Sequence, residues 1–147
     1  MSLQRTVGEF WDNKALPTLM EYIRIPAKST AYDRFWESHG YLTQCCKLGQ
    51  NWVKENVPQA RTEIIQEKGK TPCLFIDIPA SNGATEESVV FYGHLDKQPE
   101  AGGWREGLGP WTPVVEKGKL YGRGAADDGY SLFSMITAVH ALEHLGM

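Results

Sequence analysis

The sequence has no long apolar run, no block of basic residues and no pair of cysteines at metal-binding spacing. No stretch approaches the roughly 20 apolar residues of a transmembrane helix, and residues 1–5 lack the apolar run of a signal peptide. The net charge is -3, and charges of both signs are scattered along the chain. We therefore expect neither a nucleic-acid partner nor a membrane partner.

Cysteine is scarce, with Cys45, Cys46 and Cys73 as the only three. An odd count with two adjacent residues is a poor disulfide framework, and Cys-x-x-Cys spacing is absent. We predict buried thiols in a reducing compartment, which favours a cytoplasmic protein.

What is present is an ordinary globular composition of 147 residues, 41% hydrophobic and 22% charged, enough for one compact domain. Apolar residues at helical spacing predict an amphipathic helix over 5–25, in which Pro17 either starts the helix proper or kinks a longer one. The helix should end before Pro26. Residues 30–33 resemble a weak capping box for a second helix, which should end near 56–58.

After the second helix, the helical spacing of apolar residues gives way to short runs of β-branched and aromatic residues. They predict two adjacent strands over 62–67 and 73–78. Residues 81–87 have the composition of a solvated loop. The apolar run 88–93 predicts a strand buried on both faces. A final helix is predicted over 127–145, with Gly146 as its cap. This order of elements predicts a layered α/β fold, with the chain ending where the next strand of a βαβ unit should begin.

The strongest chemical signal is the His94–Leu95–Asp96 tripeptide after the predicted buried strand. Residues two apart in an extended segment project to the same face. A carboxylate that accepts the proton of one imidazole nitrogen leaves the other nitrogen free for a metal. The pair suits a zinc ligand with its orienting group, whereas a surface His–Asp pair at a strand end is the plain alternative.

A second signal is the glycine-rich turn 122–126, followed by Asp127 and Asp128 at a predicted helix start. An acidic helix cap is the plain interpretation. A phosphate loop fits poorly, because the glycine spacing differs and two carboxylates repel phosphate. A carboxylate can instead bridge two cations.

The intervening loop 104–113 is rich in aromatic residues, which we interpret as scaffolding. The remaining histidines are predicted on helices without ligand partners, and His140 and His144 are expected to form an exposed pair. They are His39, His140 and His144.

Taken in order, four stretches resemble the aminoacylase/carnosinase family of co-catalytic zinc metallopeptidases. They are Gly93–Pro99, Gly103–Trp104, Pro110–Val114 and Gly118–Asp128. Residues 25–29 also fit the first helix–loop junction of that family, so the resemblance extends from Val7 to the end. Each stretch alone is weakly diagnostic, but the ordered set is specific.

The resemblance implies a role for three residues. His94 resembles the ligand of one zinc ion, and Asp127 resembles the metal-bridging carboxylate, with a cis peptide bond expected between Asp127 and Asp128. Asp96 resembles the acidic residue that orients the histidine, and we assign it as the candidate catalytic residue. The implied cofactor is Zn²⁺, two ions per complete site, with Mn²⁺ or Co²⁺ as substitutes.

The resemblance further implies a mixed-sheet sandwich of the phosphorylase/hydrolase-like type. Residues 1–147 would be the amino-terminal portion of its catalytic domain, without the general-base Glu, the remaining ligands, or the lid or dimerisation domain. Lys97 stands where many members have Val, and Gly129–Tyr130 where many have Lys–Gly, so the substrate is less safely assigned. These features resemble a bacterial branch close to the carnosinase-like dipeptidases.

The expected activity is metal-dependent hydrolysis of an amide or peptide bond in a small peptide. The intact enzyme is expected to form a homodimer. An N-acyl amino acid deacylase or desuccinylase is an alternative substrate assignment. A non-catalytic binding module with relic ligands is the alternative from another class. The 147 residues alone are expected to be inactive, because a catalytic zinc needs about three protein ligands and two are present.

Overall fold

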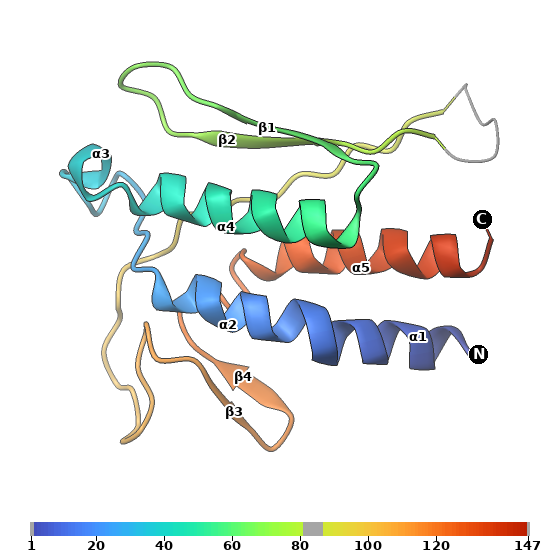
Figure 1. Cartoon of the computed structure of the whole chain (residues 1–147). Coiled ribbons are helices and arrows are strands. Elements are labelled where there is room, and N and C mark those ends of the chain that lie inside the picture. Colours follow the sequence, from blue (N-terminus) through green and yellow to red (C-terminus); the bar gives the residue numbers. More distant parts are fainter. Residues whose placement is uncertain (1, 81–86, 147) are drawn as a thin grey trace.

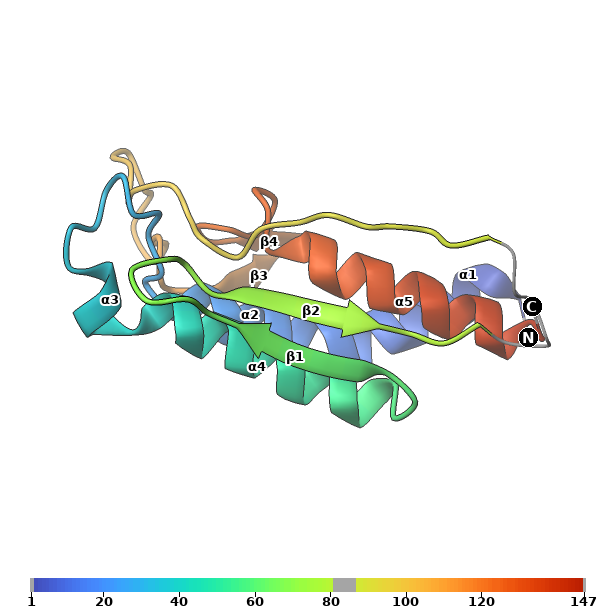
Figure 2. The ribbon, with the colours of Figure 1, turned by 90° about the horizontal axis from the view of Figure 1, so that it is seen from above.

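The computed structural model describes residues 2–80 and 87–146. Three long helical stretches lie alongside one another, with a strand hairpin over one face and a second hairpin on the opposite side (Figure 1). The termini lie near each other at one end of the helices (Figures 1 and 2). The predicted loop 81–87 lies almost wholly outside the described residues.

The first helical stretch is longer than predicted and contains a wide turn. It consists of α1 (Leu3–Phe10), a π-helical segment η1 (Trp11–Ala15) and α2 (Leu16–Arg24). Pro17 lies in the first turn of α2, but helical residues precede it directly. Proline has no N–H to donate to the preceding turn, and its ring clashes with a carbonyl group there. The wider turn directly before it accommodates this, so Pro17 interrupts a longer helix. As predicted, the helix ends before Pro26, and Ile25 is extended.

The second helix differs from the prediction at its start. A short helix α3 (Trp36–His39) is joined through Gly40, with φ of 69°, to the long α4 (Tyr41–Asn56). The capping box predicted at 30–33 is wrong, because neither helix has a side-chain cap. Asp33 accepts instead from the backbone N–H of Phe35. The predicted end near residue 56 is confirmed.

The two predicted strands are confirmed as β1 (Arg61–Ile65) and β2 (Cys73–Asp77). They pair antiparallel, with Glu63 opposite Phe75, and pack on α4. A second antiparallel hairpin, β3 (Val114–Glu116) and β4 (Lys119–Tyr121), was not predicted. Its turn signal is the Lys117–Gly118 pair, in which both residues have positive φ.

The last helix, α5 (Tyr130–His144), begins three residues later than predicted, after a turn that contains both aspartates. Gly146 has φ of 72°, which confirms it as the terminating residue. Its buried residues are Leu132, Phe133, Ile136, Thr137 and Ala141, while Leu142 is 46% exposed. The core joins α5 to the other helices through Phe133 and Trp52, whose ring centroids are 4.7 Å apart.

The buried strand predicted over 88–93 is wrong for the described residues. This segment has no strand pairing, and Val89, Val90 and Tyr92 are 78%, 90% and 86% exposed. It runs past α5 on its own (Figure 2). A strand needs neighbours that pair with its N–H and C=O groups, and the described residues provide none. They form two separate two-stranded antiparallel sheets, so the mixed-sheet sandwich stays a prediction.

The cysteines are all free thiols, of which Cys45 and Cys46 are buried and Cys73 is exposed. The prediction of buried thiols is therefore wrong for Cys73, because side chains alternate along β2 and Cys73 lies on the outward face. Burial raises the pKa of Cys45 to about 12 and that of Cys46 to about 11.

Within 2–80 and 87–146, no helix combines the length and apolar character needed to cross a bilayer.

Candidate metal site at the His94 segment

The extended segment that begins at His94 fixes the orientation of its imidazole. Nδ1 of His94 lies 3.1 Å from the carboxylate Oδ1 of Asp96 and 3.1 Å from the backbone oxygen of the same residue. Both neighbours are acceptors, so Nδ1 carries the proton and donates it. The lone pair is therefore on Nε2, which faces away from Asp96. The predicted role of Asp96 as the orienting group is compatible with this geometry.

The free nitrogen of His94 faces the second predicted ligand. Nε2 lies 3.3 Å from Oδ1 of Asp127. Asp128 turns the other way, and its Oδ2 accepts the backbone N–H of His94 at 3.2 Å. The Asp127–Asp128 peptide bond is cis, as expected from the resemblance. Two lone-pair atoms that face each other attract a cation, so the pair has the donor set of a partial metal site.

The electrostatic environment of His94 is acidic. Partial desolvation lowers the pKa of His94, but the backbone hydrogen bond and charge of Asp96, with the charges of Asp128 and Asp127, raise it more. The net pKa is raised from the ordinary value of 6.5. A site that attracts a proton in this way also attracts a metal cation once the proton has left.

The turn 122–129 that carries Asp127 is packed closely on α2. Gly124 has φ of +86°, and a Cβ on this residue would lie 2.9 Å from Cε of Lys97 and 3.0 Å from the hydroxyl of Tyr22. At Gly129 a Cβ would lie 2.0 Å from the Tyr22 ring. Glycine is required at both positions because the backbone contacts buried side chains directly. The turn thereby holds Asp127 against the His94 segment.

Two residues that support this site were missed as such by sequence reasoning. Tyr22, in the last turn of α2, donates from its hydroxyl to the backbone oxygen of Leu95 at 3.0 Å. Lys97 was noted only as a departure from the family pattern, yet it is 1% exposed. The position of Tyr22 on the apolar face of a predicted helix could have indicated its burial. The burial of Lys97 could not be predicted, because lysine is almost always exposed.

The other predicted features lie away from this site. His39 has a carboxylate partner after all, since its Nδ1 lies 2.7 Å from Asp33. His140 stacks on Phe10 with ring centroids 4.2 Å apart, so the exposed pair predicted for His140 and His144 is wrong at His140. His144 is exposed, as predicted.

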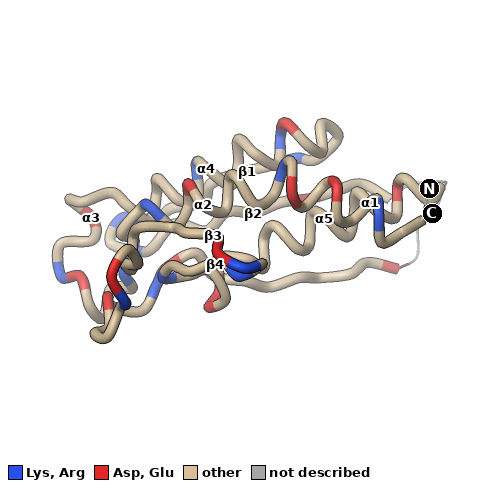
Figure 3. Tube along the Cα trace, turned by 90° about the horizontal axis from the view of Figure 1, so that it is seen from below, with Lys and Arg blue, Asp and Glu red and all other residues tan. Residues whose placement is uncertain are grey.

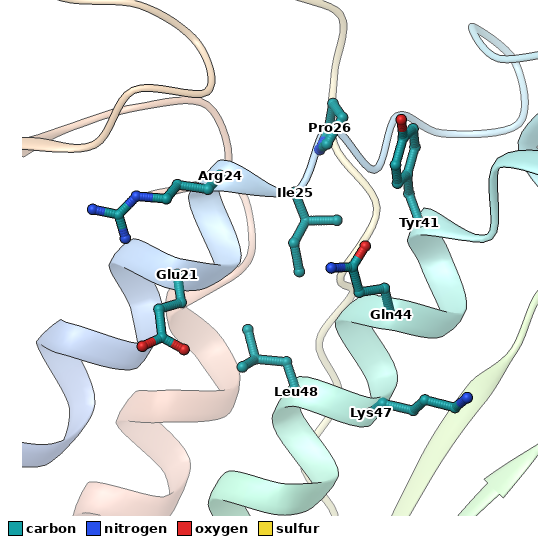
Figure 4. A pocket seen from close by; sticks show the side chains of 8 residues that line it. All are labelled: Glu21, Arg24, Ile25, Pro26, Tyr41, Gln44, Lys47 and Leu48. Carbon is teal, nitrogen blue, oxygen red and sulfur yellow. The ribbon is translucent and has the colours of Figure 1, made fainter.

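A shallow groove between α2 and α4 contains none of the candidate ligands. Ile25, Pro26 and Leu48 form its apolar floor and polar side chains border it (Figure 4).

Acidic and basic positions are interspersed along the chain (Figure 3). In the described part of the chain, no group of three or more His, Cys, Asp or Glu side chains is placed to hold a metal ion. Among these residues, the candidate site consists of the pair His94 and Asp127.

Known proteins resemble this chain in sequence. Residues 90–147 match peptidase family M20/M25/M40. The chain is 45% identical over 62 residues to a succinyl-diaminopimelate desuccinylase of Methylobacillus flagellatus and 38% over 69 residues to a Cys-Gly metallodipeptidase of Schizosaccharomyces pombe. It is 42% identical over 66 residues to the Beta-Ala-His dipeptidase of Rattus norvegicus. These alignments cover 42%, 45% and 44% of this chain.

The fold comparison extends the similarity to nearly the whole chain. The crystal structure of human carnosine dipeptidase 1 superposes with a TM-score of 0.69 over 99% of this chain at 24% identity. This chain therefore has the fold of the corresponding portion of that dipeptidase. The family match over residues 90–147, together with the dipeptidase and desuccinylase relatives, confirms the family resemblance. The chain spans 32% of the solved chain, and the alignments cover 16%, 14% and 13% of the three curated relatives.

Proposed function

We propose that this chain is the amino-terminal portion of the catalytic domain of a zinc-dependent hydrolase that cleaves the amide bond of a dipeptide. The observation that carries the proposal is the approach of His94 Nε2 to Asp127 Oδ1 at 3.3 Å. The dipeptidases among the relatives support the substrate class.

Each of three residues has a role in this proposal. His94 would hold zinc through Nε2, Asp96 would orient the imidazole by its Nδ1–H, and Asp127 would hold zinc through its carboxylate, a group able to bridge two ions. Zinc, when bound, supplies a Lewis acid and a bound water with a pKa lowered to about 7. Mn²⁺ or Co²⁺ would satisfy the same N and O donors.

We propose that the rest of the site comes from sequence beyond these residues. A catalytic zinc has about three protein ligands, and a general base is needed to move the proton to the leaving amine. We propose that further strands of the same catalytic domain pair with the exposed segment 88–93, and that a lid or dimerisation domain follows. The exposed Val89 and Val90 side chains support this part of the proposal.

A deacylase is the second candidate, because succinyl-diaminopimelate desuccinylases are among the relatives, one at 45% identity over 62 residues. Both reactions hydrolyse an amide bond, so the residues of this chain would have the same roles in either. The two candidates differ in the groups that flank the bond, and hence in pocket residues outside this chain.

The test measures intact mass, bound zinc and hydrolysis on the same preparation of the full-length gene product. Cys-Gly, Beta-Ala-His and N-succinyl-diaminopimelate are the substrates, each with and without a chelator. We expect about two zinc ions per chain, chelator-sensitive activity and a preference for the dipeptides. A preference for the succinylated substrate would select the deacylase. Full activity after complete removal of metal would exclude a zinc hydrolase.

A further inference from the structure

Lys97 is a buried cation one residue beyond Asp96. Its ammonium group donates to the backbone oxygens of Tyr22 at 2.6 Å, Ile25 at 2.6 Å and Ile23 at 3.3 Å. The residue is 1% exposed. Burial lowers its pKa to about 8, so the ammonium form still predominates at neutral pH. A buried lysine is unusual, and its three donors are satisfied by three carbonyl groups.

Those carbonyl groups lie at the end of α2, where the oxygen of Tyr22 also accepts from the N–H of Ile25 at 3.1 Å and the oxygen of Ile25 from the N–H of Ala27 at 2.8 Å. A helix leaves the carbonyls of its last turn without intrahelical partners. Ile25 is extended before Pro26, and proline has no N–H to donate here. Each carbonyl oxygen can accept two hydrogen bonds, and Lys97 supplies the additional donor. A cation at this end is also favoured by the helix dipole. Lys97 therefore terminates α2 from a distant part of the chain. Figure 4 shows this end of the helix at Arg24, Ile25 and Pro26.

The main chain of Lys97 is fixed to the same region. Its N–H donates to the oxygen of Ala27 at 2.9 Å, and its oxygen accepts from Ser29 at 2.9 Å. One residue before Asp96, Leu95 accepts the Tyr22 hydroxyl. The segment that carries His94 and Asp96 is thus attached to α2 and to the residues directly after it by both main-chain and side-chain bonds.

The turn that carries Asp127 rests on the same side chains. A Cβ on Gly124 would meet Lys97 and the Tyr22 hydroxyl, and a Cβ on Gly129 would meet the Tyr22 ring, so the turn lies close against both side chains. The Lys97 ammonium lies 3.9 Å from the centroid of the Tyr22 ring and 5.4 Å from that of Trp111. Lys97 and Tyr22 therefore lie between the end of α2, the His94 segment and the Asp127 turn.

We propose that Lys97 is a positioning residue, whose ammonium group ties the end of α2 to both candidate ligand segments and so sets the separation of His94 from Asp127. The inference rests on the proposed zinc site. The hydrogen bonds of the Lys97 ammonium go to backbone oxygens of residues 22–25, so it acts through the backbone that carries the ligands. Misplaced ligands lose metal affinity even in a folded protein, and changes in supporting residues typically cost 10–100-fold.

The experiment compares Lys97→Met with Lys28→Met in the full-length gene product. Methionine keeps the length of the side chain and removes the charge and donors. Lys28 is the matched control, because it neighbours Lys97 across an isolated bridge but directs its ammonium to Glu100 at 2.9 Å in a partly exposed ion pair. Zinc affinity is measured by chelator competition, and the absorption spectrum of the cobalt-loaded protein reports ligand geometry. Thermal unfolding identifies the temperature at which both variants are folded.

We expect Lys97→Met to lower zinc affinity by about 10–100-fold and to change the cobalt spectrum, while Lys28→Met matches wild type in both. Wild-type affinity and spectrum in Lys97→Met would overturn the positioning role. If Lys97→Met does not fold, Lys97→Gln, which keeps an N–H donor without the charge, is judged by the same two measurements. Failure of the wild-type protein to bind zinc would instead count against the proposed function.

Discussion

The Nε2 atom of His94 faces the Oδ1 atom of Asp127 across 3.3 Å, although the two residues come from separate segments. Asp96 holds the opposite ring nitrogen, so the lone pair of His94 can point only toward Asp127. The following predictions test this arrangement and the packing that maintains it.

Removal of either proposed ligand should abolish zinc binding. In the full-length gene product, we expect His94→Ala or Asp127→Ala to lower zinc affinity by more than about 100-fold, beyond the range typical of supporting residues. Chelator competition measures the affinity, and circular dichroism checks the fold. His144→Ala is the control, since His144 is exposed at the far end of α5. Unchanged zinc affinity in both ligand variants would rule out this pair as a metal site.

Removal of the orienting carboxylate should have a smaller effect on zinc and a distinct effect on the titration of His94. The acidic neighbours raise the pKa of His94. We expect Asp96→Asn to lower that pKa and to weaken zinc binding by about 10–100-fold. An NMR titration of the metal-free protein measures the first effect. A His94 pKa that is the same in Asp96→Asn and wild type would contradict the orienting role.

The same raised pKa sets the direction of a pH dependence. The folded metal-free protein binds the His94 proton more tightly than the unfolded chain does. Protonated His94 therefore favours folding fully below the ordinary pKa of 6.5, and this contribution is lost as pH rises through the raised value. Zinc needs the unprotonated ring, so zinc affinity should fall as pH drops below the raised pKa. Zinc titrations across this range check the direction, with His94→Ala as the control.

Close packing of the Asp127 turn predicts a strong effect at Gly129. A Cβ there would lie 2.0 Å from the Tyr22 ring, so Gly129→Ala must displace the ring or the turn. Overpacking of this kind typically costs about 1–3 kcal/mol, and zinc affinity should fall with it. The matched control is Gly8→Ala in α1, where nothing lies within 4 Å of the added atom. That change should stabilise the helix by about 0.5–1 kcal/mol. Thermal and denaturant unfolding measure both, and equal effects would contradict the packing.

The exposed segment 88–93 predicts how the full-length protein differs from these 147 residues alone. If further strands pair with it, its amides should exchange slowly with deuterium in the full-length gene product and rapidly in the isolated chain. Amides of α4 provide the internal reference in both samples. Rapid exchange at 88–93 in both would contradict the proposed completion of the sheet.

Several elements could be predicted because their signals are local. The proline rule predicted the end of α2 before Pro26, and alternating burial accompanies the predicted β1 and β2. Gly146 ends α5 because glycine readily adopts positive φ. The buried strand at 88–93 was wrong because burial and pairing depend on neighbours, which local composition does not contain.

For the candidate site, the sequence by itself determined the residue types. His94, Asp96 and the two aspartates were identified from spacing and from an ordered set of family stretches. Tertiary structure alone decided that Asp127 faces the ring while Asp128 binds the backbone of His94. It also decided that the ammonium group of Lys97 terminates α2. These relationships depend on distances between segments far apart in the chain, and packing of the α2 end against two glycines sets those distances.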